Sequence, residues 1–296
     1  MKSKYILLYL ASFLLCSCES DNENLDVDTS GYIELKNGMS VEKVSDSCYI
    51  YELDIILTQE QIENLETFDQ IIPESRTKGT MINGSKYYWK DRTIYYTINA
   101  NVEPGLRMSI VYALGYWGEQ TKLIFKERKN EKNYVEFLQV NNYEYGGTSN
   151  VGCIGGRQYI KLHQAAQDGT VMHEIGHAVG MLHEHQSWAF HDFPNASIVF
   201  HWDNIQPKYK AHFQKHKASH TTYNAGIVDP GYPTNSIMAY GSYNNFAIDR
   251  SKPVMSIKSM FGGLSTWTAA SDMPIPKLSI SDRMAVAAKY GYTYNP

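Results

Sequence analysis

The sequence predicts an α/β (α+β) protein with a sheet-containing first half and a loop-rich second half, and three observations support this fold class. Before Gly180, runs of β-branched and aromatic residues alternate with amphipathic helical patterns, which favours a mixed sheet with helices packed on it. After Gly180, the chain is rich in turn residues and predicts loops that end in one helix at 282–290. The 23 tyrosines suit strands and an exposed groove better than a helical bundle.

Length and charge limit the classes of function. A chain of 296 residues can bury one large hydrophobic core or two small ones. A net charge of −4 and an isoelectric point of about 6.2 provide no basic surface, so no nucleic-acid partner is expected. The four cysteines, Cys16, Cys18, Cys48 and Cys153, are too few for a disulfide-rich scaffold.

Residues 1–18 are predicted to be a targeting segment outside the fold. Two lysines precede an apolar run from Tyr5 to Leu15, which is too short to stay in a bilayer as a spanning helix. The run ends in the tetrapeptide LCSC, which resembles the lipobox of a bacterial lipoprotein with Cys18 as the lipidated residue. An ordinary cleaved signal peptide is the alternative.

The acidic stretch 19–31 predicts a solvated tether, because its polar residues cannot pack into a core. Its position after Cys18 resembles the export signal of surface lipoproteins. The protein is therefore expected at the outer membrane or the cell surface, with release after processing as an option. The lipid at Cys18 would be its contact with the membrane.

Residues 32–77 predict a small unit that depends on the domain after it. The run 49–57 is rich in β-formers and predicts one strand, and the sequence TQEQ at 58–61 is typical of a capping box that begins a short helix. Too few apolar residues remain for an independent core. The polar linker 73–79 carries two basic residues, and its composition suits proteolytic nicking.

The main domain is expected at 78–296. Its first half should contain several strands and one long helix. The predicted strands are 93–99, 122–126, 134–140 and 157–162; the predicted helix is 104–120, with Ile110, Val111, Leu114 and Trp117 on one face; glycine-rich turns are expected at 146–147 and 155–156.

The pattern H-E-x-x-H-x-x-G-x-x-H at 173–183 predicts a zinc site. His173 and His177 are four residues apart, so on a helix both project from one face and can bind one ion. Gly180 tolerates the left-handed conformation that ends a helix, which allows His183 to turn back as the third ligand. No cysteine lies in the pattern, which disfavours a structural zinc site.

Glu174 follows the first of these histidines and is not itself a ligand. It is placed to take a proton from the water that attacks a carbonyl, which predicts a hydrolytic site. Asp168 or Thr170 can cap the helix. His185 and His191 lie near the pattern but are expected to be polar surface residues.

Five spaced blocks resemble the astacin family of zinc metalloendopeptidases, a branch of the metzincins. The zinc pattern is the first block, and it is followed by Glu184 as in that family. The others are 149–162, which resembles the edge strand; 200–213, which resembles the W-x-N-I block; 236–241 (SIMAYG), which resembles the Met-turn; and 278–291, which resembles the last helix. The resemblance implies a metzincin-type fold of two subdomains with an active-site cleft between them.

The resemblance also implies roles for single residues. Met238 would form a hydrophobic floor beneath the zinc without binding it. Tyr240 would be an extra zinc ligand in the resting enzyme and would then hydrogen-bond the oxyanion of the tetrahedral intermediate, where a phenol is a good donor. Glu184 would form a buried link to the matured N-terminus, with an exposed surface acid as the alternative.

Two departures from the family pattern limit what can be carried over. Astacin domains often have two disulfides, whereas only Cys153 remains after Lys78, so stability must come from packing. The stretch 186–192 also differs from the family, so the substrate preference of relatives does not transfer.

Residues 51–55 resemble the F-x-G-D-I stretch of astacin pro-segments, in which the aspartate blocks the zinc. Asp54 is the matching residue, and Leu53 in place of glycine is expected to keep the backbone from lying close in the cleft. Cys48 is the rival, because a thiolate is a strong zinc ligand. Two further interpretations of Cys48 are a disulfide with Cys153 and a thiol without a function.

The resemblance implies an exported endopeptidase with one catalytic zinc ion, a protein or peptide substrate, and its own pro-segment as an inhibitor. Two other functions remain open: a zinc-bearing surface adhesin with little turnover, and an amidase that acts on cell-wall peptides. Glu174 argues against the adhesin, and the five family blocks argue against the amidase.

Overall fold

The computed structural model describes residues 31–34, 40–67, 80–82, 84–141, 146–186, 197–213, 221–222, 234–258 and 262–294. The predictions for the targeting segment with Cys18, the tether at 19–30, the linker 73–79 and His191 lie outside these residues. Among the described residues, no helix is both long and apolar enough to cross a bilayer.

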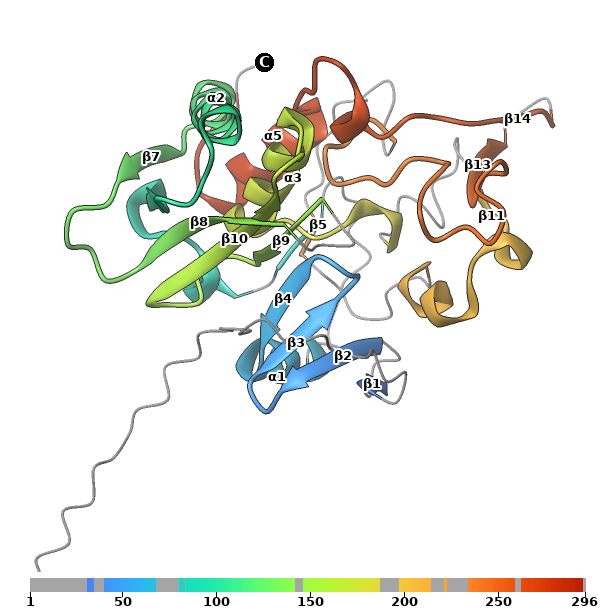
Figure 1. Cartoon of the computed structure of the whole chain (residues 1–296), viewed down its shortest axis with the longest axis horizontal. Coiled ribbons are helices and arrows are strands. Elements are labelled where there is room, and N and C mark those ends of the chain that lie inside the picture. The colour runs from blue at the N-terminus through green and yellow to red at the C-terminus, as the bar shows by residue number, and fades with distance from the viewer. Residues whose placement is uncertain are drawn as a thin grey trace, which may run out of the picture.

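A nine-stranded mixed sheet runs through the molecule in the order β1-β2-β3-β4-β9-β10-β8-β6-β7 (Figure 1). Strand β8 is parallel to both β10 and β6, and β6 is parallel to β7. The strands are β1 (Tyr32–Glu34), β2 (Ser40–Ser45), β3 (Cys48–Tyr51), β4 (Ile55–Thr58), β6 (Thr93–Ile98), β7 (Ile124–Glu127), β8 (Tyr134–Val140), β9 (Gly147–Asn150) and β10 (Arg157–His163). The four strands predicted in the first half of the main domain are therefore confirmed.

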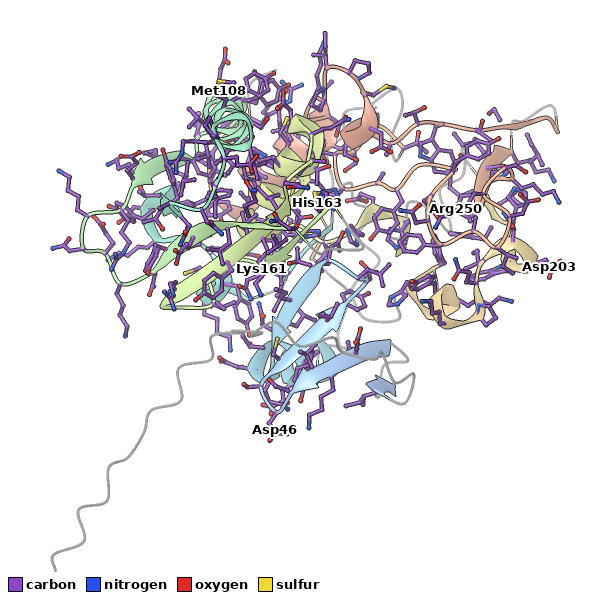
Figure 2. The ribbon with its side chains drawn as sticks, viewed as in Figure 1. Asp46, Met108, Lys161, His163, Asp203 and Arg250 are labelled. Atoms are coloured by element: carbon purple, nitrogen blue, oxygen red, sulfur yellow. The ribbon has the colours of Figure 1, made fainter. Side chains whose placement is uncertain are left out.

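Helices α2 (Pro104–Gln120), α3 (Asp168–Val179) and α5 (Ile280–Lys289) lie together on one side of this sheet (Figure 1). Helix α2 has the predicted bounds, and its residues Ile110, Leu114 and Trp117 are buried in the main core. Val111 is 54% exposed, so its predicted place on the buried face is wrong. It lies on the outer side of the helix, as does Met108, which Figure 2 shows pointing away from the sheet.

The unit that precedes the main domain extends the sheet instead of forming a separate body. Its last strand, β4, pairs in parallel with β9, and its buried side chains share a core with residues of the main domain such as Val151 and Leu182. The unit thus packs against the main domain, and its dependence on that domain stays a prediction. The unit also contains α1 (Gln59–Thr67), where Thr58 and Gln61 form the predicted reciprocal cap.

The single strand predicted at 49–57 is wrong. The structure has two antiparallel strands, β3 and β4, joined by a three-residue tip of Glu52, Leu53 and Asp54. Glu52 and Leu53 have φ angles of 52° and 79°, so the chain reverses there. We call Glu52, Leu53 and Asp54 the hairpin tip. In Figure 1 the hairpin points from the blue strands toward the middle of the molecule.

The second half consists mainly of loops and short helices around a core of its own. That core includes Ile205, Phe213 and Phe246, and Leu53 of the hairpin tip also packs into it. The remaining elements are β5 (Thr80–Met81), η3 (Ser85–Tyr87), η4 (Lys90–Arg92), η5 (Glu184–Gln186), β11 (Ser197–Phe200), η6 (Trp202–Asn204), η7 (Pro207–Phe213), β12 (Thr221–Thr222), β13 (Met255–Lys258), β14 (Leu264–Ser265) and η8 (Ala270–Asp272). The predicted division into a sheet-containing half and a loop-rich half is confirmed.

Candidate metal centre and active site

Helix α3 carries two of the three predicted ligands. Its N-cap is Gln167, which makes no side-chain cap bond, so the expectation that Asp168 or Thr170 caps the helix is wrong. The helix ends as predicted at Gly180, whose φ of 114° lies in the left-handed region that a side chain disfavours. The chain then turns back and brings the third histidine to the first two.

The three histidines converge through one ring nitrogen each. Nε2 of His173 lies 3.0 Å from Nε2 of His183 and 3.2 Å from Nε2 of His177. All three side chains are buried. The prediction that these residues come together is confirmed by the geometry.

Hydrogen bonds on the opposite side of the rings set the tautomers. Nδ1 of His173 donates to the carbonyl of Ile237 at 2.7 Å, and Nδ1 of His177 donates to the carbonyl of Met181 at 2.9 Å. Because a carbonyl oxygen can only accept, each proton lies on Nδ1 and each Nε2 lone pair points into the cluster.

This donor set fits zinc. Nitrogen lone pairs that face one another at such distances repel unless a cation lies between them. Imidazole nitrogens bound to one tetrahedral zinc at about 2.0–2.1 Å are roughly 3.3 Å apart, close to the observed spacing. Among the described residues, the cluster around the three histidines contains no cysteine, which is the usual ligand of structural zinc.

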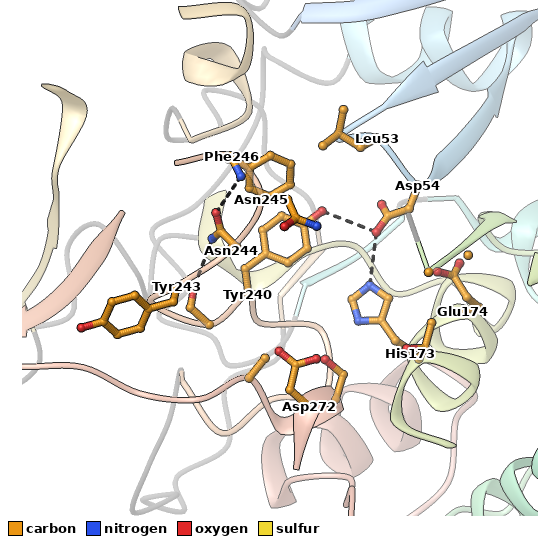
Figure 3. Close-up of a pocket in the computed structure, with 16 residues that line it drawn as sticks. Leu53, Asp54, His173, Glu174, Tyr240, Tyr243, Asn244, Asn245, Phe246 and Asp272 are labelled. Carbon is orange, nitrogen blue, oxygen red and sulfur yellow. Dashed lines mark hydrogen bonds and ion pairs between the residues drawn. The ribbon is translucent and has the colours of Figure 1, made fainter. Parts of the chain in front are cut away.

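Asp54 of the hairpin tip completes the cluster. Its Oδ2 lies 3.3 Å from Nε2 of His183 and 3.6 Å from Nε2 of His173, and its Oδ1 lies 3.8 Å from Nε2 of His177. Figure 3 shows the carboxylate between His173 and Tyr240. Burial alone would raise the pKa of Asp54, but the histidines outweigh burial and lower the pKa, so Asp54 is a carboxylate at this position.

Leu53 does not keep the backbone out of the cleft, contrary to expectation. The backbone N–H of Ser149 donates to the carbonyl of Asp54 at 2.8 Å, so the tip lies directly against β9. Positive φ angles at non-glycine residues such as Glu52 and Leu53 cost on the order of 1–3 kcal/mol each. The Leu53 side chain is only 5% exposed, and this burial offsets part of the strain.

Cys48 lies away from the histidines. It is on β3 opposite Thr58, and the histidine cluster contains Asp54 in its place. Cys48 and Cys153 are both buried, and they are not joined in a disulfide. These positions favour Asp54 over Cys48 as the residue that faces the metal.

Glu174 is buried beside the cluster with one oxygen, Oε2, that has no hydrogen-bond partner among the described residues. Burial raises its pKa well above the usual range, and the neighbouring Asp54 raises it further. Gly147 of β9 lies against this carboxyl: a Cβ at Gly147 would be 2.8 Å from Cγ of Glu174. A buried carboxyl with a raised pKa at a cleft has the properties of a general base.

Tyr240 also faces the hairpin tip. Its hydroxyl donates to the carbonyl of Glu52 at 3.0 Å and lies 3.4 Å from Oδ2 of Asp54. Its ring stacks on His185 with centroids 4.3 Å apart. His185 is fully buried, and its Nε2 donates to the carbonyl of His212 at 2.9 Å. The expected surface position of His185 is therefore wrong, because its ring supports the tyrosine.

Met238 is fully buried against α3, and its place as a floor beneath the zinc stays a prediction. Its Sδ would be 2.6 Å from a Cβ at Gly176, so the sulfur packs where the helix has no side chain. Glu184 is also fully buried, and its backbone N–H donates to the Met238 carbonyl at 3.0 Å. An exposed position for Glu184 is excluded, whereas its link to a matured N-terminus stays a prediction.

Asp282 is a residue that sequence reasoning missed. It accepts hydrogen bonds from Oγ of Ser236 at 2.5 Å and from the N–H of Ile237 at 3.0 Å, and it also caps α5 together with Ser279. Because the carbonyl of Ile237 holds His173, the cap of the last helix sets the position of a metal ligand. The capping box before α5 was the available signal.

The cleft in front of the histidines has a volume of about 340 Å³ and lies between the two halves (Figure 3). Helix α3 forms one side, and the segment after the Met-turn forms the other. Its lining includes Leu53, Asp54, Gly147, Thr170, His173, Glu174, Tyr240, Tyr243, Asn244 and Asp272. Three convergent imidazoles beside a buried acid in such a cleft define a metal-dependent hydrolase.

Comparison with known proteins gives the family. The model of the peptidase family described as Astacin matches residues 81–264. The chain belongs to the astacin family.

Individual relatives are more distant. Zinc metalloproteinase nas-12 of Caenorhabditis elegans is 29% identical over 205 residues, which are 68% of this chain and 49% of that protein. The low choriolytic enzyme of Oryzias latipes is 24% identical over 288 residues, which are 94% of this chain and 96% of that protein. The chain thus spans about half the length of the first relative and nearly all of the second.

The solved structure of high choriolytic enzyme 1, a hatching enzyme zinc-protease from Oryzias latipes, has a similar fold. The TM-score is 0.55 at 22% sequence identity, and the match covers 73% of this chain and 100% of that one. This likeness confirms the metzincin-type fold.

Proposed function

We propose that this chain is an exported zinc metalloendopeptidase, made as a precursor whose residues 32–77 block the active site until they are removed. The observation that carries the proposal is the position of Asp54. A carboxylate from a segment outside the matched family domain faces the Nε2 atoms of all three histidines, where a substrate carbonyl would otherwise bind.

His173, His177 and His183 would hold the metal. When bound, zinc acts as a Lewis acid that polarises the substrate carbonyl and acidifies a water molecule. Glu174 accepts the proton of the attacking water and then delivers it to the leaving amine, because its carboxyl lies beside the cluster and is not one of the converging ligands. The hydroxyl of Tyr240, once the hairpin tip has left, is free to donate a hydrogen bond to the oxyanion.

Removal of the pro-segment would open both the cluster and the adjacent sheet edge. Strand β4 pairs with β9 through Ile55 and Ile56, so its departure frees backbone groups of β9 next to Glu174. An extended peptide can bind such an edge by adding a strand. Cleavage within 73–79 would release the pro-segment and create an N-terminus for which buried Glu184 is the proposed partner.

The same proposal includes a lipid anchor at Cys18 and a location at the outer membrane or cell surface. The apolar run before Cys18 and the acidic tether after it support this part. Cys18→Ser should move the protein from the membrane fraction to the soluble fraction of cell lysates. A variant that stays in the membrane fraction contradicts the anchor, and Cys16→Ser is the matched control that should stay bound.

A substrate comparison tests the activity. Protein freed of residues 32–77 is incubated with casein and with a cell-wall preparation, with and without a zinc chelator. Chelator-sensitive cleavage of casein alone is expected. Release of peptides from cell wall alone would point to an amidase, and cleavage of neither, with zinc bound, would point to an adhesin.

A further inference from the structure

The hairpin tip delivers a second carboxylate that the zinc pattern does not account for. Glu52 is fully buried, and its Oε2 lies 2.6 Å from Nδ1 of His183. Its Oε1 lies 3.8 Å from Nε2 of His185. A carboxylate is buried at such a position only when a donor compensates for the loss of water, and His183 provides that donor.

The direction of this hydrogen bond matters for the third ligand. A carboxylate accepts, so one proton of His183 lies on Nδ1, and Nε2, which faces Asp54 and the other two histidines, is the nitrogen left to bind a metal. His173 and His177 obtain the same arrangement from backbone carbonyls of the main domain. In the described structure, His183 obtains it from the pro-segment.

The shape of the tip makes both contacts possible at once. Glu52 and Asp54 flank Leu53, and the positive φ angles at Glu52 and Leu53 turn the chain so that the two carboxylates reach opposite nitrogens of the same ring. Leu53 anchors the tip by packing into the core of the loop-rich half. The tip therefore holds His183 from both sides.

We propose that Glu52 is a positioning residue for His183, so that the pro-segment of the precursor strengthens zinc binding while Asp54 blocks access to it. Carboxylate partners of ligand histidines fix the ring and raise its basicity, and their loss typically lowers metal affinity on the order of 10–100-fold. The inference rests on the proposed function, in which residues 32–77 leave. The latent form then retains zinc more tightly than the released form, which loses Glu52.

The test measures zinc affinity of the uncut full chain by competition with a chromophoric chelator, in a Glu174→Gln background that cannot cut itself. Glu52→Gln keeps the shape and removes the charge, and Glu52→Ala removes both. Glu60→Gln is the matched control, because Glu60 also joins the pro-segment to the main domain, through Lys86, but is exposed and far from the histidines in the fold.

The dissociation constant should rise about tenfold for Glu52→Gln and up to about a hundredfold for Glu52→Ala, and it should stay unchanged for Glu60→Gln. Unchanged affinity in Glu52→Gln would overturn the proposal. An equal loss in Glu60→Gln would also overturn it, because the cause would then be a loosened pro-segment.

A comparison without a variant at Glu52 provides the second measurement. The precursor is nicked in the linker 73–79 and freed of its pro-segment, and its zinc affinity should be on the order of 10–100-fold weaker than that of the uncut chain. Equal affinities would contradict the role of Glu52. Since neither measurement uses peptidase activity, an inactive enzyme would refute the proposed function without affecting this result.

Discussion

Helix α3 and the hairpin tip meet at the same metal cluster, but they are built in opposite ways. The helix brings His173 and His177 to the site from the middle of the main core, where every residue of its inner face is packed. The hairpin tip brings Glu52 and Asp54 from a four-stranded extension, through two strained backbone conformations.

Under the proposed function, this difference separates groups that the released enzyme keeps from groups that leave with residues 32–77. His173 and His177, which the released enzyme would keep, lie on α3 inside the family domain and are held by carbonyls of that same domain. The groups that would have to leave lie on a short turn, which contacts the main domain through the β4–β9 pairing, a small shared core and Leu53 in the core of the loop-rich half. Substitutions on each side of the cluster can break or sharpen this contrast.

The largest effect is expected for a substitution on α3. Glu174→Gln should lower kcat of the released enzyme by several orders of magnitude, because the side chain carries the proton transfers. Zinc content, measured by atomic absorption, should remain that of the wild type, since Glu174 is not one of the converging ligands. Near wild-type turnover would contradict its role as the base.

Tyr240 lies in the main domain, and its hydroxyl contacts the hairpin tip. In the released enzyme, Tyr240→Phe should lower kcat on the order of 10²–10³-fold and change KM much less, because the hydroxyl acts on the transition state. Steady-state kinetics on a peptide substrate measures this. A change confined to KM would show that the ring only packs or binds substrate.

A substitution at Asp282 tests whether the main-domain side of the metal cluster depends on α5. Asp282→Ala leaves the hydroxyl of Ser236 and the N–H of Ile237 without their buried acceptor, which should lower the free energy of unfolding by about 3 kcal/mol. Urea unfolding measures the loss. Asp203→Ala is the control, because Asp203 is exposed and should change stability by less than about 0.5 kcal/mol. Equal stability of the two variants would exclude the structural role of Asp282.

The smallest effect concerns His212, whose backbone supports His185. Burial lowers the pKa of His212 from 6.5 to about 4. Between these values the unfolded chain binds a proton that the folded chain does not, so stability falls as the pH decreases from 6.5 toward 4. His212→Gln should remove up to about 3 kcal/mol of this loss. Urea unfolding at pH 7 and pH 4.5 measures it, and identical slopes for both proteins would contradict the assignment.

The sequence predicted well what depends on local pattern. Helix α2 and strand β8 have their predicted bounds, and α3 ends at Gly180, because long periodic runs and a glycine stop are local signals. The three histidines were found for the same reason, since their spacing along one helix and one turn fixes their geometry.

The parts that failed depend on contacts between distant segments. Glu52 and His183 are 131 positions apart, and no local pattern relates them. Leu53 has a positive φ angle, which is typical of glycine. Because the sequence has leucine at this position, no turn was predicted and the run 49–57 was interpreted as one strand. A polar side chain such as His185 predicts a surface position. His185 is buried because the loop-rich half folds over it.

The central claim is that the hairpin tip blocks the site through the Asp54 carboxylate. The most direct measurement is peptide hydrolysis by the uncut precursor carrying Asp54→Ala or Cys48→Ala, with Arg76 and Lys78 replaced by alanine and intactness checked on a gel. Hydrolysis is expected with Asp54→Ala and not with Cys48→Ala, because Asp54 faces the three histidines and Cys48 does not. Hydrolysis only with Cys48→Ala, or no hydrolysis by either variant, would contradict the claim.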